Sequence, residues 1–226
     1  MILQELHERL LAWATAEPRK SLLLQARKIH FEQSGEPHEE DKSFESRMNR
    51  MLNAYLYDYR PDGGATMLEQ FIAHEGPVLP PADVVHLQDM TKNVLGLFQV
   101  RRIRPEEIRL RDLFTDGDYD VTERRQLAGL AKGDLFEARL LPHEGRLFFS
   151  GAFLYHPQEV KKPILSEVKR LKKQAGKGNI PDVNAFLAQL SRMAFKLERY
   201  RNVKVESLYD FSAEARTLTP GPVHRG

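Results

Sequence analysis

The side chains that could do chemistry are concentrated in a basic run between residues 161 and 177, where Glu167 is the one acid. Lys162, Lys169 and Lys173 follow at spacings of seven and four residues, so a helix would place them on one face, where they could bind phosphates. The alternative is a solvated helix face, because lysine-rich surfaces without a partner are common. The candidate nucleic-acid site comprises Lys162, Lys169, Arg170, Lys172, Lys173 and Lys177, and further basic residues follow at Arg192, Lys196, Arg199, Arg201 and Lys204.

Carboxylates and histidines are present, but their spacing gives no metal site. The aspartates between residues 112 and 120 could hold a weak calcium or magnesium ion, although aspartates that bond to their own backbone in tight turns explain the same residues. The acidic segment 36–41 lacks an EF-hand or HExxH pattern. We therefore predict no metal ligands. No partner spacing singles out any one of His30, His74, His86, His143 and His156.

Patterns for covalent or cofactor chemistry are missing as well. The chain has no cysteine, which removes disulfides, thiolate zinc sites and cysteine nucleophiles. Ser150 does not lie in the G-x-S-x-G elbow of a hydrolase, and Gly63-Gly64 lacks the lysine and serine of a phosphate-binding loop. We expect no catalytic residue and no cofactor, and an enzyme of unrecognised type stays open as a further alternative.

These side chains must be positioned by a chain whose pattern changes from helix to strand and back. Helical spacing of apolar residues predicts helices over 2–13, 18–33 and 44–59. Thr66 and Glu69 form a capping-box pair that predicts a helix to about residue 74, and another helix should follow Pro80-Pro81. Helical spacing returns over 157–175 and again from residue 181, after which VKVESLYDF could be an extended edge.

Between these helices, residues 95–155 alternate apolar and polar positions in short stretches separated by turn signals such as Asp116-Gly117. Five strands at this spacing favour a small barrel or a strongly curved antiparallel sheet. Alternation would turn Arg111, Asp112 and Arg139 towards solvent. If the sheet curls, they could instead face a groove and form ion pairs with Asp120 or Glu137.

We therefore predict an α+β protein. It has a helical N-terminal arm (1–93), a small five-stranded antiparallel barrel-like unit (94–156), a two-helix C-terminal arm (157–216) and a flexible tail (217–226). Whether these parts form one composite domain or two stays open. We expect the helix over 44–59 to cover the apolar face of the strands, which carries Phe98, Phe136, Phe148 and Phe153.

Composition limits the classes of function. A 226-residue chain with 41% hydrophobic residues can build a substantial core. Because 34 basic residues face 32 acidic ones, any basic surface must be local. The N-terminus lacks the basic start of a signal peptide, and no segment approaches the roughly 18 apolar residues of a membrane span. We expect a cytoplasmic protein without membrane contact.

Three segments, LGLFQVRRI, IRLRDLFTDGDYDVTER and GLAKGDLFEARLLPHEGRLFFSGAF, resemble a poorly characterised bacterial family whose small β-unit often occurs beside SEC-C motifs. The upstream LYDYRPDGGATMLEQFIA looks like the aromatic-rich helix and D-G-x-T segment before that β-unit, so the similarity covers about residues 44–155. SEC-C motifs bind metal through cysteines and a histidine. Since this chain has no cysteine, the resemblance implies a fold and no metal site.

Two functions from different classes follow. Long amphipathic helices with aromatic and methionine residues offer apolar faces, so we expect a non-catalytic cytosolic adaptor that binds another protein or a second copy of itself. The alternative is a nucleic-acid-binding protein that uses the basic helical surface of residues 161–204. The apolar surface expected for protein contacts comprises Leu10, Leu11, Trp13, Leu22, Leu23 and Leu24.

Overall fold

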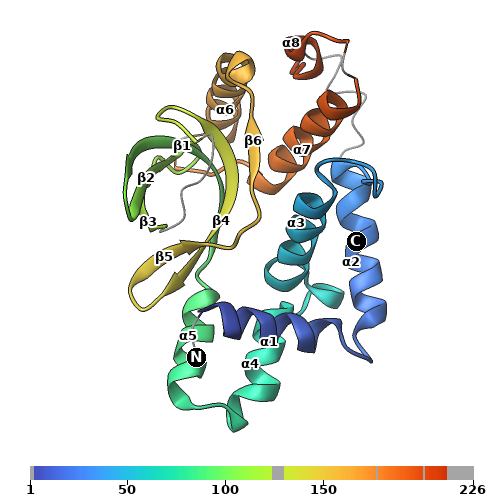
Figure 1. Cartoon of the computed structure of the whole chain (residues 1–226), viewed down its shortest axis with the longest axis vertical. Helices are drawn as coiled ribbons and strands as arrows, with labels where there is room; N and C mark the ends of the chain where they lie inside the picture. The colour runs from blue at the N-terminus through green and yellow to red at the C-terminus, as the bar shows by residue number, and fades with distance from the viewer. Residues whose placement is uncertain (1–2, 124–129, 177, 201, 213–226) are drawn as a thin grey trace.

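A helical arm, a β-barrel and a second group of helices follow one another along the chain (Figure 1). The computed structural model describes residues 3–123, 130–176, 178–200 and 202–212. Its helices are α1 (Leu3–Thr15), α2 (Lys20–Ser34), α3 (Phe44–Tyr57), α4 (Met67–Glu75), α5 (Pro81–Met90), α6 (Lys161–Ala175), α7 (Val183–Arg199) and α8 (Val205–Leu208). Its strands are β1 (Val94–Arg104), β2 (Glu107–Asp112), β3 (Asp118–Thr122), β4 (Leu135–His143), β5 (Arg146–Phe149) and β6 (Leu154–His156). The predicted α+β class with a barrel unit is confirmed.

The N-terminal helices pack around one apolar cluster. Leu6 and Leu10 of α1 are fully buried against Tyr55 of α3 and Phe71 of α4. The predicted capping box opens α4: the Thr66 hydroxyl accepts a hydrogen bond from the Glu69 backbone N–H at 3.2 Å, and the Glu69 carboxylate accepts one from the Thr66 N–H at 2.7 Å. These contacts stabilise the first turn of α4, one helix of the N-terminal arm.

Hydrogen bonding closes the barrel in the order β1-β2-β3-β5-β4-β1, and β6 adds to the edge of β4. The long strand β1 pairs with both β2 and β4 and carries an irregularity between Val100 and Arg102, which allows the sharp bend. Contrary to our expectation, the barrel is not wholly antiparallel, because β3 and β5 are parallel. An odd number of strands cannot alternate in direction around a closed ring, so at least one parallel pair is required.

Closure also changes how the phenylalanines are buried. Phe98 and Phe136 are fully buried inside the barrel together with Val100 and Leu110. We expected a helix to cover Phe98, Phe136, Phe148 and Phe153. For Phe98 and Phe136 this is wrong, because the curled sheet encloses its own inner face; Phe153 packs partly buried against them, and Phe148 is not in this cluster.

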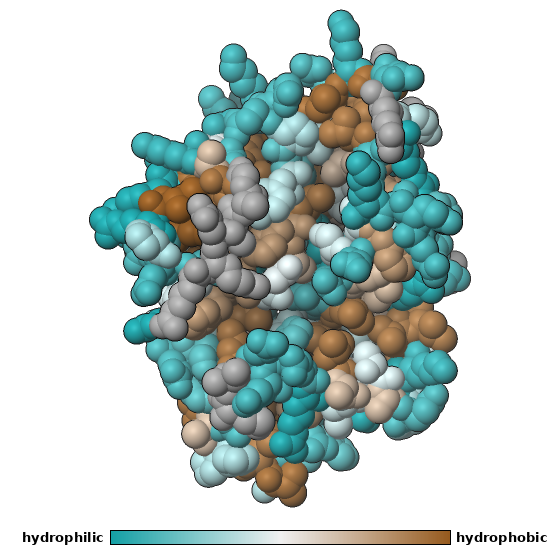
Figure 2. All heavy atoms as spheres, in the orientation of Figure 1, coloured by the Kyte–Doolittle hydropathy of each residue, from teal (hydrophilic) through white to brown (hydrophobic). Residues whose placement is uncertain are grey.

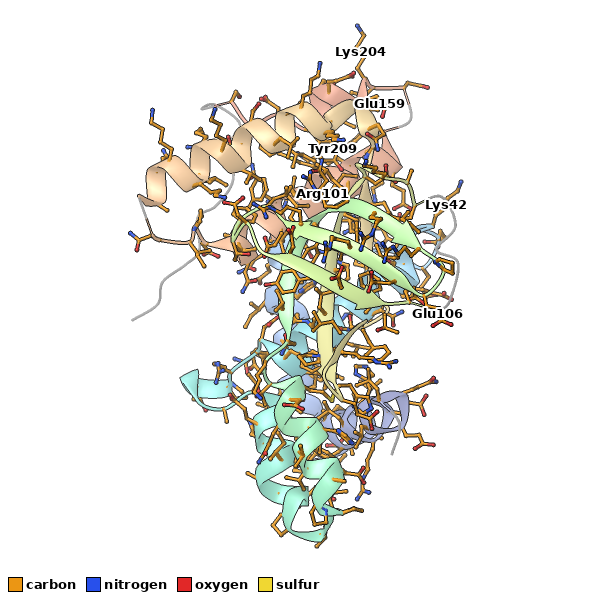
Figure 3. The ribbon with its side chains drawn as sticks, turned by 90° about the vertical axis from the view of Figure 1, so that its left-hand side faces the viewer. Lys42, Arg101, Glu106, Glu159, Lys204 and Tyr209 are labelled. Atoms are coloured by element: carbon orange, nitrogen blue, oxygen red, sulfur yellow. The ribbon has the colours of Figure 1, made fainter. Side chains whose placement is uncertain are left out.

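Helices cover part of the outside of the barrel. Apolar residues of α6 and α7 pack on Leu97 and Leu135, and the ring of Phe186 lies edge-on to that of Phe114 at 5.6 Å. The helix α3 approaches β4 through the ion pair of Arg50 with Glu137, and its Ser46 hydroxyl donates a hydrogen bond at 2.8 Å to the carbonyl of Phe153, just before β6. Beyond Leu97, the outer face of β1–β3 has no helix over it among the described residues, and it faces the viewer in Figure 3.

Two further points concern the ends and the surface. The segment VKVESLYDF contains α8 and no strand among its described residues, so the expected extended edge is wrong. The expected tail at 217–226 lies outside the described residues.

Within the described ranges, no helix is both long and apolar enough to cross a membrane. Figure 2 shows hydrophobic side chains in separate patches among hydrophilic ones on the face seen in Figure 1.

Candidate nucleic-acid interface

The uncovered outer face of the barrel carries rows of polar side chains. Strand register places Gln99, Arg111 and Asp118 in one row across β1, β2 and β3. A second row holds Arg109 between Arg102 and Asp120. Across β1 to β3 this face carries Arg101, Arg102, Arg104, Arg109 and Arg111 against Glu107, Asp118 and Asp120, a surplus of two positive charges.

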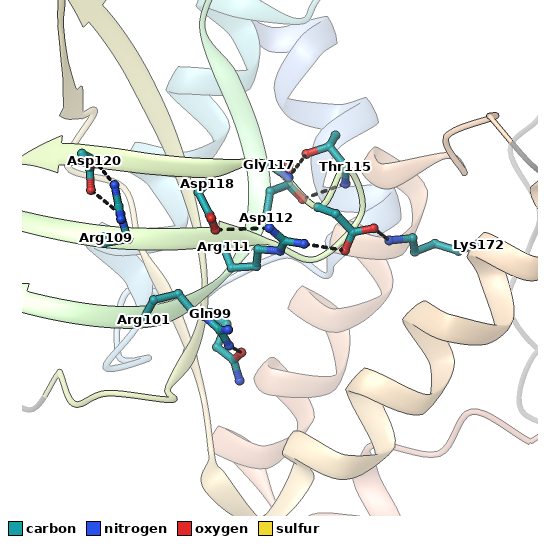
Figure 4. A network of polar contacts seen from close by, with 11 residues as sticks. Gln99, Arg101, Arg109, Arg111, Asp112, Thr115, Gly117, Asp118, Asp120 and Lys172 are labelled. Atoms are coloured by element: carbon teal, nitrogen blue, oxygen red, sulfur yellow. Dashed lines mark hydrogen bonds and ion pairs between the residues drawn. The ribbon is translucent and has the colours of Figure 1, made fainter.

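Ion pairs hold Arg109 and Arg111 against acidic residues of the barrel (Figure 4), and Arg102 pairs with Glu107. Arg109 donates two hydrogen bonds to the Asp120 carboxylate, at 2.8 and 2.6 Å, and this contact holds the pKa of Asp120 below its usual value. Arg111 lies 3.4 Å from an oxygen of Asp118. Arg101 hydrogen-bonds only to the neutral side chain of Gln99, at 3.0 Å, among the residues that the structure describes. Its charge is therefore available to a ligand.

The β2–β3 turn links this face to α6. Asp112 is buried and accepts hydrogen bonds from the backbone N–H groups of Phe114 and Thr115, at 2.8 and 3.4 Å. Asp116 binds Lys172 of α6, and the lysine keeps the pKa of Asp116 below its usual value. The aspartates thus cap a turn and pair with cations, as the turn interpretation predicts. The expectation that Asp112 faces solvent is wrong.

The predicted basic helix is present as α6, beside the barrel face (Figure 3). Lys162, Lys169 and Lys173 are exposed. Arg170 donates hydrogen bonds to Glu167 one turn away, at 2.7 and 2.5 Å, while Lys172 points to the barrel. The remaining residue of the set, Lys177, lies outside the described residues.

The basic residues of the last helix do not all extend this surface. Arg192 donates a hydrogen bond to the Glu32 carbonyl of α2 at 2.5 Å, and Arg199 pairs with Asp41 at 3.0 Å. These two arginines fasten α7 to the N-terminal arm. Lys196 and Lys204 are exposed, and Arg201 lies outside the described residues.

The apolar residues expected to meet a protein partner are mostly turned inward. Leu10 is fully buried, and Leu11, Trp13, Leu22 and Leu23 pack partly buried against the same cluster. Leu24 is different, because 54% of it is exposed.

A buried polar network lies where the barrel meets the helical arms, and it pairs Arg139 with residues other than the Asp120 or Glu137 expected for a curled sheet. Arg139 is 3% exposed and pairs with Asp58 and Asn93, so the expectation that alternation turns it to solvent is wrong. Glu137 binds Arg50 of α3 and His156 of β6. Charged residues at outward strand positions gave no signal of burial, because a helix from a distant part of the chain covers them.

Chain folding also brings together His86 of α5 and His143 and Glu144 at the β4–β5 turn, which sequence spacing did not single out. Their ligand atoms lie within 4.8 Å of one another. Among the described residues, no other group of three or more such side chains could hold a metal ion.

Comparison with known proteins gives a family and no function. Residues 2–206 match a family of unknown function, DUF7986. The chain belongs to this family. The match covers the helical arm, the barrel and the basic helix together, and it carries no indication of SEC-C motifs or of a bacterial origin. No curated protein and no solved structure matches the chain.

The chemistry available at the barrel face is charge recognition. No aromatic side chain is among the described residues in its rows, so the stacking platforms of many single-strand binders are missing there. Arginine guanidinium groups can bind phosphates in a bidentate manner and can stack on bases. The face therefore fits a polyanion better than an apolar ligand.

Proposed function

We propose that this protein binds single-stranded nucleic acid with the outer face of β1–β3 and the adjacent lysines of α6. The observation that carries the proposal is a closed barrel whose β1–β3 face bears five arginines and, beyond Leu97, no helix among the described residues, beside a helix with three exposed lysines. The proposal extends the nucleic-acid alternative suggested by the basic run and moves its centre onto the barrel. Its place would be the cytoplasm, the compartment expected for a cysteine-free chain.

The barrel's connectivity supports the proposal by analogy. The order β1-β2-β3-β5-β4-β1 with a parallel β3–β5 pair is that of OB-fold barrels. Proteins with that fold bind oligonucleotides and oligosaccharides on the face of strands 2 and 3. A shared topology alone does not decide function. Here the same face is enriched in arginine, and beyond Leu97 no helix of the described residues covers it.

The existing ion pairs do not prevent phosphate binding. Arg109 and Asp120 are 41% and 39% exposed, and pairs of this kind contribute only about 0–1 kcal/mol. A phosphate can therefore replace the aspartate at small cost. Arg101, Lys169 and Lys173 need no such exchange, so they should make the first contacts.

The test uses fluorescence anisotropy with a labelled, mixed-sequence single strand of about 20 nucleotides, long enough to exceed the site of one OB-fold. Wild-type protein should bind at low salt and lose affinity linearly in a plot of log K against log salt. Replacing Arg101, Lys169 and Lys173 by glutamine should reduce the slope by about 2, at 0.7 per lost phosphate contact on a single strand.

A charge-matched control distinguishes an effect of this surface from an effect of the protein's net charge. The exposed Lys20, Lys28 and Lys92 lie on α2 and just after α5, away from the barrel face, and their replacement by glutamine removes the same charge. This variant should bind like the wild type. Absence of binding at low salt, or an equal loss in both triple variants, would contradict the proposal.

A second candidate is the adaptor function, favoured by one observation on α2. Leu24 borders an open hollow of about 370 Å³ that is also lined by Phe31 and by charged side chains. A partner helix could place an apolar residue there. Leu24→Asp should then abolish capture of a protein partner, or self-association in sedimentation velocity, without lowering the melting temperature. Unchanged association in the variant would refute this use of the hollow.

A further inference from the structure

The junction between α5 and the β4–β5 hairpin combines two imidazoles and a carboxylate. His143 ends β4, Glu144 forms the turn with a positive φ of 49°, and His86 projects from α5. The imidazole rings lie 4.4 Å apart between centroids, and His86 Nε2 is 3.7 Å from a carboxylate oxygen of Glu144. One ligand atom from each residue lies within 4.8 Å of the other two.

The state of His143 points to a missing partner. His143 is only 8% exposed, and its Nδ1 atom is buried without a hydrogen-bond partner among the described residues. Buried polar atoms are satisfied in the great majority of cases, and an unsatisfied one calls for an explanation such as a bound ion.

Nearby carboxylates favour a cation at this position. Metal ions bind histidine through a neutral imidazole nitrogen. The negative charges of Glu144 and Asp89 act on His143. Their negative field would stabilise a divalent ion at this position.

We propose that His86, His143 and Glu144 bind one Zn²⁺ ion. Nitrogen and carboxylate donors suit zinc, whereas magnesium and calcium prefer oxygen ligands alone. Tetrahedral coordination at about 2.0–2.1 Å needs ligand atoms about 3.4 Å apart. The ligand atoms of His86 and Glu144, at 3.7 Å, nearly meet this separation. Small side-chain rotations would bring the other pairs of ligand atoms to it. Three protein ligands leave the fourth position to water or an incoming ligand.

The ion would tie the helical arm to the barrel, because its ligands come from α5 and from the β4–β5 hairpin. This site is separate from the barrel face of β1–β3, so the zinc proposal and the nucleic-acid proposal can fail independently. Its chemistry is also distinct from that of a cysteine-based motif, which this chain cannot form.

Zinc binding is measured on the untagged, full-length protein after removal of metal, by competition with a chromophoric chelator. We expect one Zn²⁺ per chain, a higher melting temperature with zinc, and no competition from Mg²⁺. Glu144→Gln, at an exposed turn position that tolerates the change, and His86→Gln should each weaken zinc binding at least about tenfold. Co²⁺ should give the intense visible absorption of a tetrahedral site in the wild type and lose it in both variants.

His74→Gln serves as the matched control, since His74 is 70% exposed on α4 and lies outside the ligand group. It should bind zinc like the wild type. The proposal is overturned if the wild type binds no zinc at micromolar concentration, or if the Glu144 and His86 variants bind it as tightly as the control.

Discussion

Replacing Glu137 with glutamine tests how strongly the barrel is held to both helical arms. Glu137 is 1% exposed on β4 and binds Arg50 of α3. On its other side its Oε1 lies 3.1 Å from His156 Nε2, and His156 Nδ1 lies 3.2 Å from the Tyr209 hydroxyl. One carboxylate thereby connects the N-terminal arm, the barrel and the C-terminal segment.

The expected cost follows from what the substitution leaves behind. Breaking a buried ion pair by removing one partner costs about 3–5 kcal/mol, because the other charge stays buried and unpaired. The Arg50 side chain is 14% exposed and glutamine keeps one neutral acceptor, so we expect a loss near the lower limit, about 3 kcal/mol. At about 2–4 °C per kcal/mol for a chain of this size, the melting temperature should fall by roughly 6–12 °C.

Urea unfolding followed by far-ultraviolet circular dichroism measures this loss. The midpoint should fall while the m-value stays constant, because the same surface is exposed on unfolding. The matched control is Glu107→Gln, which breaks the pair with Arg102 in which both side chains are 40% exposed, and it should cost less than about 1 kcal/mol. If the two variants differ by less than about 1 kcal/mol, the buried network does not hold the parts together and the reasoning is refuted.

The same carboxylate gives a pH dependence with a definite sign. Burial is the largest influence on Glu137 and opposes its ionisation, but Arg50 and His156 together outweigh it and keep the pKa below 4.5. The folded protein therefore releases this proton more readily than the unfolded chain. The stabilisation is present above pH 4.5 and is lost as the pH falls through the lower folded pKa. Glu137→Gln should flatten this acid-side decline in the free energy of unfolding.

Two further substitutions test local features by thermal melts and urea unfolding. Thr66→Ala removes the cap of α4 and should cost about 1 kcal/mol, whereas Thr66→Ser should be nearly neutral; equal stability of the alanine variant would show that the capping box contributes nothing. Gly96→Ala places a methyl group 2.8 Å from the buried ring of Phe98 and should cost about 1–3 kcal/mol. Its control, Gly76→Ala, meets no atom closer than 4.0 Å and has helical backbone angles, so it should be neutral or slightly stabilising, and similar melts for the two variants would be evidence against the close packing.

The local chemistry of the sequence predicted the elements of this fold. Periodicity separated the helices from the strands because a helix repeats its apolar face every 3.6 residues or so and a strand every second residue. Thr66 and Glu69 marked the start of α4 because a capping box forms within one turn of chain. The basic run predicted the exposed lysines of α6, since charge and helical spacing are both properties of the sequence.

The tertiary structure decided which of these faces meet. The parallel β3–β5 pair follows from closing five strands into a ring. The sequence of a single strand does not specify that closure. Arg139 and Glu137 follow the alternation of surface residues, yet both are buried, and α3 with the residue after it supplies their partners Arg50 and Asp58 from far away in the sequence. Likewise, His86 and His143 become neighbours only when α5 packs against β4. Contacts within one turn are determined by local sequence, whereas burial and charge pairing depend on what the rest of the chain places alongside.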